Sequence, residues 1–443
     1  MSIKSVTVKD KQTRAKAPRP GRAAPRRGRA SDHAEGDLSP TDIASTELAR
    51  QINRDVVLRL IRSMQPIARV DLARSSGLQN STVSSLVDQL LAEGWIREGE
   101  ARKTARGRRP TQISLNDSLS MLVADVHPGR ATYGAVDLNG HVLASAEIEM
   151  PLDVEEGVRK LGSAMQEMRA RYPERRFEGA GVCLPGRVDI ETSRLMVAPN
   201  LRWREFDIRQ ALVGILGMPV EMENDANACL LSELWFGHLD RVRNAVLLAI
   251  SEGVGASLLA EGQLISGRLG MAGEFGHVCM DSKGPLCNCG RRGCWEVFAS
   301  SRAALQHYRE LAPTNKTSIG YEELCRLALE GEPAAREAIE RQATAVGRGL
   351  RMVTAALDPE VILFVGEIAL AWSIVEPILH RECQANLLAG DCPRFVCAGD
   401  TNKAHILGAA AVVLQRHSGY YSSRTPYPRK IELAHTIELT GAA

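Results

Sequence analysis

"MLVADVHPGRATYGAVDLNGHVLASAEIEM", residues 121–150, predicts an apolar strand, a turn and a hairpin that closes at Asn139-Gly140. Asn-Gly is a preferred pair for a tight two-residue hairpin turn, because both positions require a positive φ. A second stretch, "NAVLLAISEGVGASLLAEGQLISG" at residues 244–267, repeats the same order of strand and hairpin. Two similar halves of this kind predict two α/β lobes with a cleft between them.

Helices and buried strands complete each predicted half. A helical segment at 154–172 precedes a buried strand at 179–186, and residues 218–237 predict a strand that runs into a helix. A later buried strand at 359–366 lies between helices, and 405–419 has the apolar spacing of a final amphipathic helix. We therefore expect lobe 1 at residues 119–240, completed by a helix at 403–418, and lobe 2 at residues 241–402.

Three short helices and a two-stranded ribbon are expected ahead of the lobes, in residues 49–118. Apolar residues recur at helical spacing in 53–64, 69–77 and 79–94. Two short β-prone runs, "WIREGE" and "TQISLN", follow and bracket the basic segment "ARKTARGRRP". This order is typical of a winged helix-turn-helix.

The third predicted helix and the ribbon tip carry the candidate DNA contacts. The helix would begin with Asn80 or Ser81 as N-cap and end at Gly94. Small polar side chains can approach base edges in the major groove, and arginines beside a glycine can reach phosphates or a narrow minor groove. A helical bundle with an exposed basic loop is the alternative. The candidate DNA-binding residues are Asn80, Ser81, Thr82, Ser84, Ser85, Arg106, Gly107, Arg108 and Arg109.

The composition favours a soluble protein of two or three domains. The 443 residues are too many for one compact domain, and the 44% hydrophobic content can build several cores. The longest apolar runs, such as residues 245–250, are too short to cross a bilayer, and the N-terminus lacks the apolar segment of a secretory signal. The ten cysteines cluster, which favours metal binding in a reduced compartment over a disulfide framework. We expect a cytoplasmic protein without a membrane partner.

The net charge of +2 is unevenly distributed along the chain. Residues 1–30 contain many lysines and arginines against the single acid Asp10, with proline, alanine and glycine between them. Such a segment cannot bury enough apolar surface to offset its ordering entropy. We expect residues 1–48 to form a disordered basic arm, which is either a solvated tail or an attraction site for nucleic-acid phosphates. Residues 419–443 form a tail without a clear signal.

"GHVCMDSKGPLCNCGRRGCWE", residues 276–296, holds four of the ten cysteines and one of the ten histidines. The spacing of His277, Cys287, Cys289 and Cys294 fits one tetrahedral Zn²⁺ ion with three sulfur ligands and one nitrogen ligand. Four protein ligands leave no open position for catalysis, and no second histidine follows as in a DNA-reading finger. The sequence predicts a structural zinc, with a group of free buried thiols as the alternative.

Several separate motifs are similar, in the same order, to those of the ROK family, which includes sugar kinases and transcriptional repressors. They are "LPGRVD" (184–189), "ENDANA" (223–228), "GEFGH" (273–277), "CNCGRRGCWE" (287–296) and "DPEVILFVG" (358–366). The resemblance covers residues 49 to about 417. It implies a winged helix-turn-helix followed by a two-lobed, actin-like and ribonuclease-H-like sugar kinase fold, as in the repressors of the family.

The resemblance also implies a sugar site beside the metal loop. It selects the same four metal ligands and leaves Cys279 out. Asn224 and Asp225 follow a predicted strand, where ligand sites of open α/β sheets lie, and they could equally cap a helix. Asparagine can both donate to and accept from hydroxyls. At the positions that match the family, the implied sugar-binding residues are Gly186, Arg187, Asn200, Asn224, Asp225, Glu274, His277 and Glu296.

The phosphate loops of the family's kinases are altered in this chain. The first, roughly D-x-G-G-T in the kinases, keeps Asp125 but continues with a proline, which removes a backbone donor. The second, roughly G-T-G, reads Ser-Glu-Gly at 251–253, where a carboxylate would repel phosphate. The third usually ends in a glycine pair and reads Val-Gly-Glu at 365–367. We therefore predict no catalytic residue. Asp225, which matches the general base of the family's kinases, would be vestigial as a base and would accept a hydrogen bond from a sugar hydroxyl.

The sequence thus predicts a sugar-responsive DNA-binding transcriptional regulator, most often a repressor in this family, with a structural zinc. Operator DNA and a sugar or sugar phosphate are the expected partners. A homodimer or homotetramer would place two winged helices on a palindromic site. An ATP-dependent sugar kinase with a DNA-binding appendage is one alternative, and a DNA-binding protein with a vestigial sugar site is the other.

Overall fold

The computed structural model describes residues 46–99, 111–188, 195–198, 203–204, 206–237, 239, 242–268, 270–313, 319–386, 390–398 and 401–416. Several predictions fall elsewhere in the chain. The ribbon tip with Arg106, Gly107, Arg108 and Arg109 lies outside the described residues, as does Asn200. So do the tail at 419–443 and the basic arm at 1–48, apart from its last three positions, which begin the first helix.

The N-terminal unit is the winged helix-turn-helix that the sequence predicts. Its three helices are α1 (Thr46–Met64), α2 (Arg69–Ser76) and α3 (Asn80–Ala92). Its three strands are β1 (Ile67–Ala68), β2 (Ile96–Glu98) and β3 (Gln112–Leu115). They form an antiparallel sheet of order β1-β3-β2, which holds the base of the predicted ribbon against the helices.

Helix α3 turns one apolar face inward. Gly77 and Gly94, predicted as stops, follow α2 and α3 with φ of 72° and 76°, in the left-handed region that favours glycine. The predicted N-cap at Asn80 or Ser81 is wrong, because the extended backbone of Gln79 starts the helix one residue earlier without a side-chain cap bond. The buried residues of α3 repeat at helical spacing and are Val83, Leu86, Val87 and Leu90.

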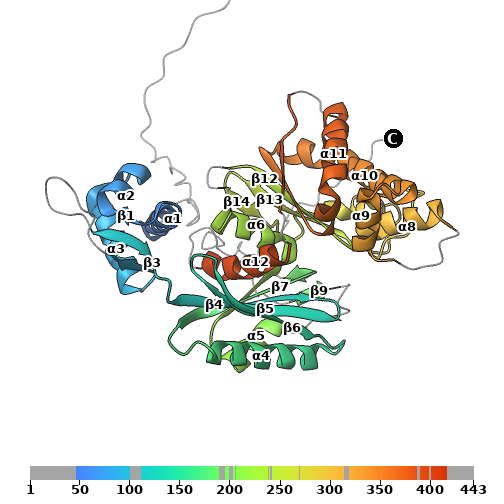
Figure 1. Cartoon of the computed structure of the whole chain (residues 1–443). Helices are drawn as coiled ribbons and strands as arrows, with labels where there is room; N and C mark the ends of the chain where they lie inside the picture. The colour runs from blue at the N-terminus through green and yellow to red at the C-terminus, as the bar shows by residue number, and fades with distance from the viewer. Residues whose placement is uncertain are drawn as a thin grey trace, which may run out of the picture. The chain divides into compact units, whose positions relative to one another are not determined.

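Lobe 1 is built on a five-stranded sheet of order β11-β7-β4-β5-β6. Its strands are β4 (Leu119–His127), β5 (Arg130–Asp137), β6 (Val142–Glu149), β7 (Arg176–Leu184) and β11 (Val220–Asn224). Gly140, with φ of 81°, closes the predicted hairpin between β5 and β6. Figure 1 shows α4 (Val154–Ala170) and α5 (Ile208–Leu216) under this sheet and α12 (Thr401–Arg416) on its other face.

Lobe 2 repeats this topology in a sheet of order β14-β13-β12-β15-β16. Its strands are β12 (Ala245–Ile250), β13 (Val254–Ala260), β14 (Gln263–Ile265), β15 (Val361–Val365) and β16 (Arg394–Cys397). In both sheets three strands form an antiparallel meander and two more add in parallel beside the first strand. The repeat predicted from the two hairpins is confirmed.

Helices and a small sheet complete the body. The helices are α7 (Glu296–Ala299), α8 (Ser301–Leu311), α9 (Tyr321–Leu329), α10 (Pro333–Leu357) and α11 (Trp372–Asn386), with the short 3₁₀ helices η1 (Glu274–His277) and η2 (Glu367–Ala371). The small sheet contains β8 (Arg187–Val188), β9 (Leu195–Ala198) and β10 (Trp203–Arg204). None of the described helices is both long and apolar enough to span a membrane.

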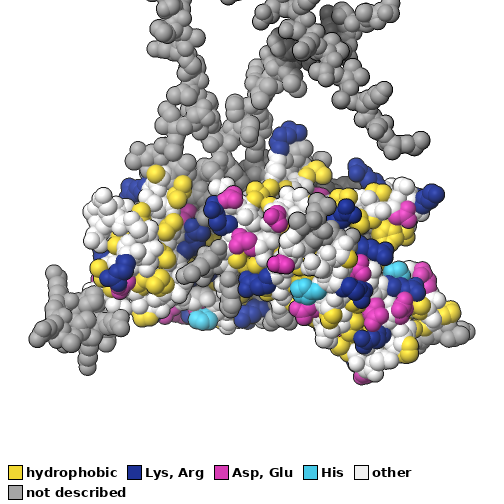
Figure 2. Space-filling model, turned by 90° about the horizontal axis from the view of Figure 1, so that it is seen from above, with side chains coloured by type: hydrophobic (Ala, Val, Ile, Leu, Met, Phe, Trp, Pro, Cys, Tyr) yellow, Lys and Arg dark blue, Asp and Glu magenta, His cyan; other side chains and the backbone are white. Residues whose placement is uncertain are grey.

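Charged side chains of both signs cover the body on the face seen in Figure 2. Pairs of opposite charge lie one turn apart on α10, such as Arg336 with Glu340 at 3.0 Å and Arg341 with Glu337 at 2.9 Å. Exposed pairs of this kind contribute only about 0.3–0.5 kcal/mol each. They balance the surface charge rather than creating a surface of one sign.

Helix α6 (Asp225–Trp235) packs beside α12 and reaches the N-terminal unit. The apolar residues between them belong to one buried cluster, in which Val57 and Ile61 of α1 join Leu231 and Trp235 of α6. Ala410 of α12 lies in the same cluster. The winged helix-turn-helix and lobe 1 therefore share part of their hydrophobic core.

Candidate functional site

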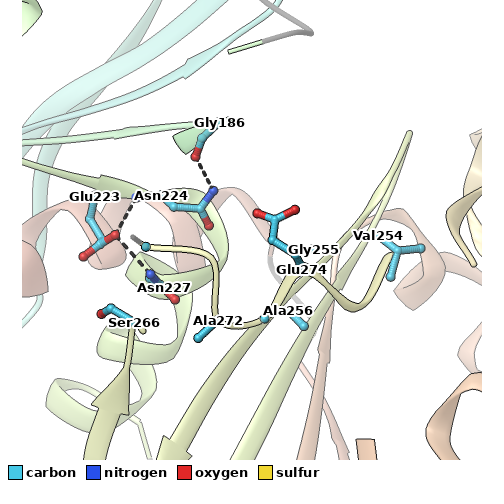
Figure 3. Close-up of a pocket in the computed structure, with 12 residues that line it drawn as sticks. Gly186, Glu223, Asn224, Asn227, Val254, Gly255, Ala256, Ser266, Ala272 and Glu274 are labelled. Atoms are coloured by element: carbon cyan, nitrogen blue, oxygen red, sulfur yellow. Dashed lines mark hydrogen bonds between the residues drawn. The ribbon is translucent and has the colours of Figure 1, made fainter. Parts of the chain in front are cut away.

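A pocket lies where α6 begins, lined by residues from both sheets (Figure 3). Three predicted sugar-site residues, Gly186, Asn224 and Glu274, line it although they are distant in sequence. Figure 3 shows their side chains and backbone gathered around one space. The other residues of the lining are Glu223, Asn227, Val254, Gly255, Ala256, Ser266, Gly270, Ala272 and Gly273.

Asn224 joins the pocket wall to α6. Its Oδ1 accepts a hydrogen bond from the backbone N–H of Ala226 at 2.9 Å, so it is the N-cap of the helix. Its Nδ2 donates to the carbonyl of Gly186 at 2.8 Å. An amide side chain has two donor hydrogens and two acceptor lone pairs, so these bonds leave capacity for a hydroxyl ligand. The capping and ligand-binding interpretations of this residue are compatible.

Polar contacts cross from lobe 1 to lobe 2 beneath the pocket. Oε1 of Glu223 accepts from the backbone N–H of Asn224 at 2.9 Å and from Nδ2 of Asn227 at 3.1 Å. The hydroxyl of Ser257 on β13 donates to Oδ1 of Asn227 at 2.7 Å. Glu223 and Asn227 were not predicted as site residues. Both residues belong to "ENDANA", and the strand–helix junction within this motif brings Asn227 Nδ2 to Glu223.

Asp225 opens α6 beside the pocket and is half-buried. Burial raises the pKa of this carboxyl above its ordinary value, although the nearby His405 and His127 act in the opposite direction. Ionising it inside the protein therefore costs more than in water. Asp225 is not part of the pocket lining, and for Arg187 the structure describes the backbone in β8 but not the side chain.

The four predicted metal ligands lie together, with ligand atoms within 4.8 Å of one another. His277 Nδ1 and Cys287 Sγ are 3.6 Å apart, and so are the sulfurs of Cys289 and Cys294. Zinc with bonds of about 2.3 Å to sulfur and about 2.0 Å to nitrogen holds tetrahedral neighbours roughly 3.5–3.8 Å apart. The residues present therefore fit one tetrahedral metal ion. Cys279 is exposed and lies outside this cluster.

Helix η1 connects the metal cluster with the pocket. Residues Glu274–His277 form this single 3₁₀ turn. Residues three apart lie on the same side of such a helix, and His277 Nε2 is 3.8 Å from Glu274 Oε2. Glu274 lines the pocket, whereas His277 and Glu296 do not.

Glu296 lies on the buried side of the cluster. Its Oε1 accepts a hydrogen bond from the Cys287 thiol at 3.0 Å and is 3.9 Å from Nη2 of Arg302. Burial, together with this bond to Glu296, raises the pKa of the Cys287 thiol well above its usual range. Without a metal ion, Cys287 is thus a protonated thiol, and its hydrogen bond occupies Oε1 of Glu296.

The first altered phosphate loop lies at the end of β4. The buried Asp125 carboxylate pairs through Oδ2 with His127 Nε2 at 2.8 Å and through Oδ1 with His405 Nδ1 at 3.3 Å. Burial alone would raise the pKa of Asp125, but the hydrogen bonds to His127 and His405 hold it well below its usual range. His405 was not predicted as a site residue, and its 280-residue separation from Asp125 left no local signal.

The other two altered loops meet beside β12. The backbone N–H of Ser251 donates to the carbonyl of Gly253 at 3.1 Å, and the backbone N–H of Glu367 donates to Ser251 Oγ at 3.2 Å. Nε of Arg302 donates to the carbonyl of Glu252 at 2.5 Å. Glycine-rich phosphate loops bind through free backbone N–H groups. Two such groups are already engaged within this protein.

Helix α3 exposes small polar side chains. Asp88 on the same helix is exposed but pairs with Arg69 at 2.7 Å. Short hydroxyl and amide groups can approach base edges without steric cost. The predicted contacts on α3 divide into exposed Asn80, Ser81 and Ser85 and half-buried Thr82 and Ser84.

The far end of α6 contacts α1 of the winged helix-turn-helix. Nη2 of Arg62 donates to the carbonyl of Leu234 at 3.2 Å, and the guanidinium lies 5.9 Å from the centre of the Trp235 ring. The indole N–H of Trp235 donates to Oε1 of Gln415 on α12 at 3.2 Å. One helix of 11 residues thus joins the pocket to the N-terminal unit.

Known proteins resemble the chain over most of its length. The xylose repressor of Bacillus spizizenii is 27% identical over 386 residues, which cover 84% of this chain and 98% of the relative. A crystal structure described as a ROK family transcriptional regulator, homolog of E. coli MLC protein, has a TM-score of 0.74 at 26% identity and covers 85% of this chain and 98% of its own. A ROK family glucokinase from Streptomyces griseus, in complex with glucose and AMPPNP, has a TM-score of 0.61 at 25% identity and covers 67% of this chain and 99% of its own.

The fold and the site define a two-lobed, sugar-kinase-like protein that carries a winged helix-turn-helix. The ROK family model matches residues 128–416, and the chain belongs to the ROK family. The MarR family model matches residues 52–98, within the winged helix-turn-helix. The predicted family and fold class are confirmed.

Proposed function

We propose that this protein is a sugar-responsive transcriptional repressor. Operator DNA binds to α3 and the ribbon, and a sugar or sugar phosphate binds in the pocket at the start of α6. The observation that carries the proposal is the placement of α6, with Asn224 at the pocket and Trp235 at α1. A ligand that contacts one arrangement of this helix better than another shifts DNA binding by that difference in affinity. The name of the xylose repressor supports this function.

The polar groups of the pocket suit the hydroxyls of a sugar. Asn224 keeps donor and acceptor capacity, and the half-exposed Glu274 carboxylate supplies a charged acceptor. Gly273 lets the Glu274 turn lie against β13: its φ is 92°, and a Cβ would lie 2.2 Å from the Ala256 carbonyl oxygen. Predicted contacts from Gly186, Arg187, Asn200, Asp225, His277 and Glu296 belong to the same proposal.

A zinc ion held by His277, Cys287, Cys289 and Cys294 supports this pocket. Zinc binding removes the thiol proton of Cys287, so Glu296 loses the hydrogen bond that it accepts in the metal-free cluster. The ion also fixes the imidazole of His277 beside Glu274. The proposed role of zinc is therefore to orient Glu274 through His277 and to free one oxygen of Glu296 from the Cys287 thiol.

Substitution of Cys289 by serine tests this role. We expect the variant to lose the zinc and to bind the effector sugar roughly 10-fold more weakly, within the effect expected for disturbed groups around a metal site. Cys279→Ser, in the same loop but outside the cluster, is the matched control. Full sugar affinity in a zinc-free Cys289→Ser protein would contradict the role.

Catalysis is not part of the proposed function. The backbone donors at Ser251 and Glu367 are engaged, and Asp125 is held between two histidines. A coupled ATPase assay against a panel of hexoses tests the kinase alternative. If the wild type turns over ATP with a hexose and Asp225→Asn does not, the kinase hypothesis would replace the regulator hypothesis.

DNA binding tests the main proposal directly. Duplexes selected by the protein from a genomic library serve as probes, and a panel of aldoses and aldose phosphates serves as effectors. We expect selective binding that at least one effector weakens. A melting temperature that does not change with any of these sugars or sugar phosphates would favour the vestigial sugar site instead. A dimer or tetramer in solution would support the expected two-fold operator.

A further inference from the structure

We propose that Asp125, His127 and His405 form a second metal site, separate from the cysteine cluster, which binds one divalent transition-metal ion such as Zn²⁺. Each residue contributes one ligand atom, and the three atoms lie within 4.8 Å of one another. Two of the residues are on strand β4, and His405 is on helix α12. A metal ion at this site would link helix α12 to β4, the central strand of the lobe 1 sheet.

The separations between the ligand atoms suit a small metal ion. Oδ2 of Asp125 lies 2.8 Å from His127 Nε2, and Oδ1 of the same carboxylate lies 3.3 Å from His405 Nδ1. A tetrahedral zinc with bonds of about 2.0–2.2 Å holds neighbouring nitrogen and oxygen ligands roughly 3.3–3.5 Å apart. Small side-chain rotations therefore place all three atoms around one centre.

The ligand set is one that divalent transition metals use. Two imidazoles with one carboxylate bind zinc in catalytic sites and iron in non-haem sites, with further positions left to water or a ligand. Asp125 and His405 are 4% and 7% exposed, which shields the centre from solvent. His127 is 28% exposed at its side chain and gives an ion a path inward.

The ligands lie among buried groups. Cys229 of α6 is buried beside His405. The centres of the His127 and His405 rings are 5.4 Å apart, and the ring planes are tilted by 53° to each other. The three ligand atoms are thus already within 4.8 Å of one another, so only small rotations are needed to bind an ion.

Metal content of the full chain tests the site. The protein is stripped with a chelator, reloaded with Co²⁺ and freed of unbound metal by gel filtration. We expect two equivalents of cobalt in the wild type and one in His127→Gln. Because His127 is partly exposed, this variant should keep the fold, and circular dichroism checks that it does. His405→Gln is a second variant with the same expected loss.

The absorption spectrum distinguishes the two sites. Cobalt in the cysteine cluster gives a thiolate-to-metal charge-transfer band, which nitrogen and oxygen ligands do not give. His127→Gln should keep this band while losing one equivalent, and Cys289→Ser should lose the band while keeping the other equivalent. Cobalt that is lost in His127→Gln supports the second site even if the cysteine cluster stays empty. Unchanged metal content in folded His127→Gln and His405→Gln proteins would overturn the proposal.

Discussion

The two ends of helix α6 differ in the chemistry of their contacts. At the N-terminal end, Asn224 caps the helix and bonds Gly186 beside a polar pocket. At the C-terminal end, Trp235 is buried in an apolar core shared with α1, and Arg62 lies over its ring. One end offers hydrogen-bonding capacity to a ligand, and the other is packed against the DNA-binding unit.

This difference indicates how a signal would pass along the helix. A hydroxyl ligand can exchange for water at the polar end at little cost, since the groups there are partly exposed. The apolar end cannot adjust by small amounts, because close-packed cores favour discrete arrangements. A shift of α6 at the pocket would therefore appear at α1 as a change between arrangements.

The largest expected effect is on operator affinity, and it comes from a substitution on α3 that leaves both ends of α6 unchanged. Ser85→Glu puts a carboxylate on the exposed face of α3, where it would repel DNA phosphates, and should weaken operator binding roughly 10- to 100-fold. Sugar binding should not change. Ser163→Glu, at an exposed position of α4, is the control and should bind DNA normally. Equal DNA affinity of the two variants in a fluorescence-anisotropy titration would exclude α3 as the recognition helix.

Removing the charge of one pocket residue should change sugar affinity by a smaller factor. Glu274→Gln keeps the shape of the side chain but removes its charge, and we expect roughly 10-fold weaker sugar binding by calorimetry. DNA affinity without sugar should stay at the wild-type value. Glu155→Gln, at an exposed position of α4, is the matched control. A sugar affinity equal to that of the control would remove Glu274 from the site.

The smallest expected effect concerns stability at the polar end. Because burial raises the pKa of Asp225 in the folded protein, the wild type is relatively most stable when this carboxyl is protonated. Its stability falls as pH rises through the folded-state pKa. Asparagine cannot ionise, so Asp225→Asn should melt roughly 2–4 °C higher than the wild type at pH 8, both stripped of metal. The gap should narrow as pH falls through the folded-state pKa of Asp225, and equal melting temperatures of the two proteins at every pH would contradict this prediction.

Features encoded in short stretches could be predicted from the sequence. The candidate metal ligands Cys287, Cys289 and Cys294 lie in one loop, and the hairpin at Asn139-Gly140 follows from two residues. The strand–helix junction in "ENDANA" has the same local character. In each case chain connectivity alone brings the residues together, so spacing is sufficient evidence.

Features assembled by tertiary packing could not be predicted in this way. His405 meets Asp125 only because α12 lies on β4, and Arg62 meets Leu234 only because α1 packs against α6. Neither pair has a spacing that a sequence pattern can detect. The one-residue error at the start of α3 has another cause, because Gln79 begins the helix by its backbone conformation without a capping side chain.

The most direct test of the account is the effector response of Arg62→Met. This variant removes the hydrogen bond to Leu234 and the charge over Trp235 while keeping an apolar side chain of similar reach. Operator affinity is measured with and without saturating sugar in the wild type, in Arg62→Met and in Arg50→Met, a control that loses only an exposed bond from α1 to Gln89. The account predicts a change of roughly 5- to 150-fold in the wild type and control, and less than about 2-fold in Arg62→Met, which still binds the sugar. The same change in all three proteins would contradict it.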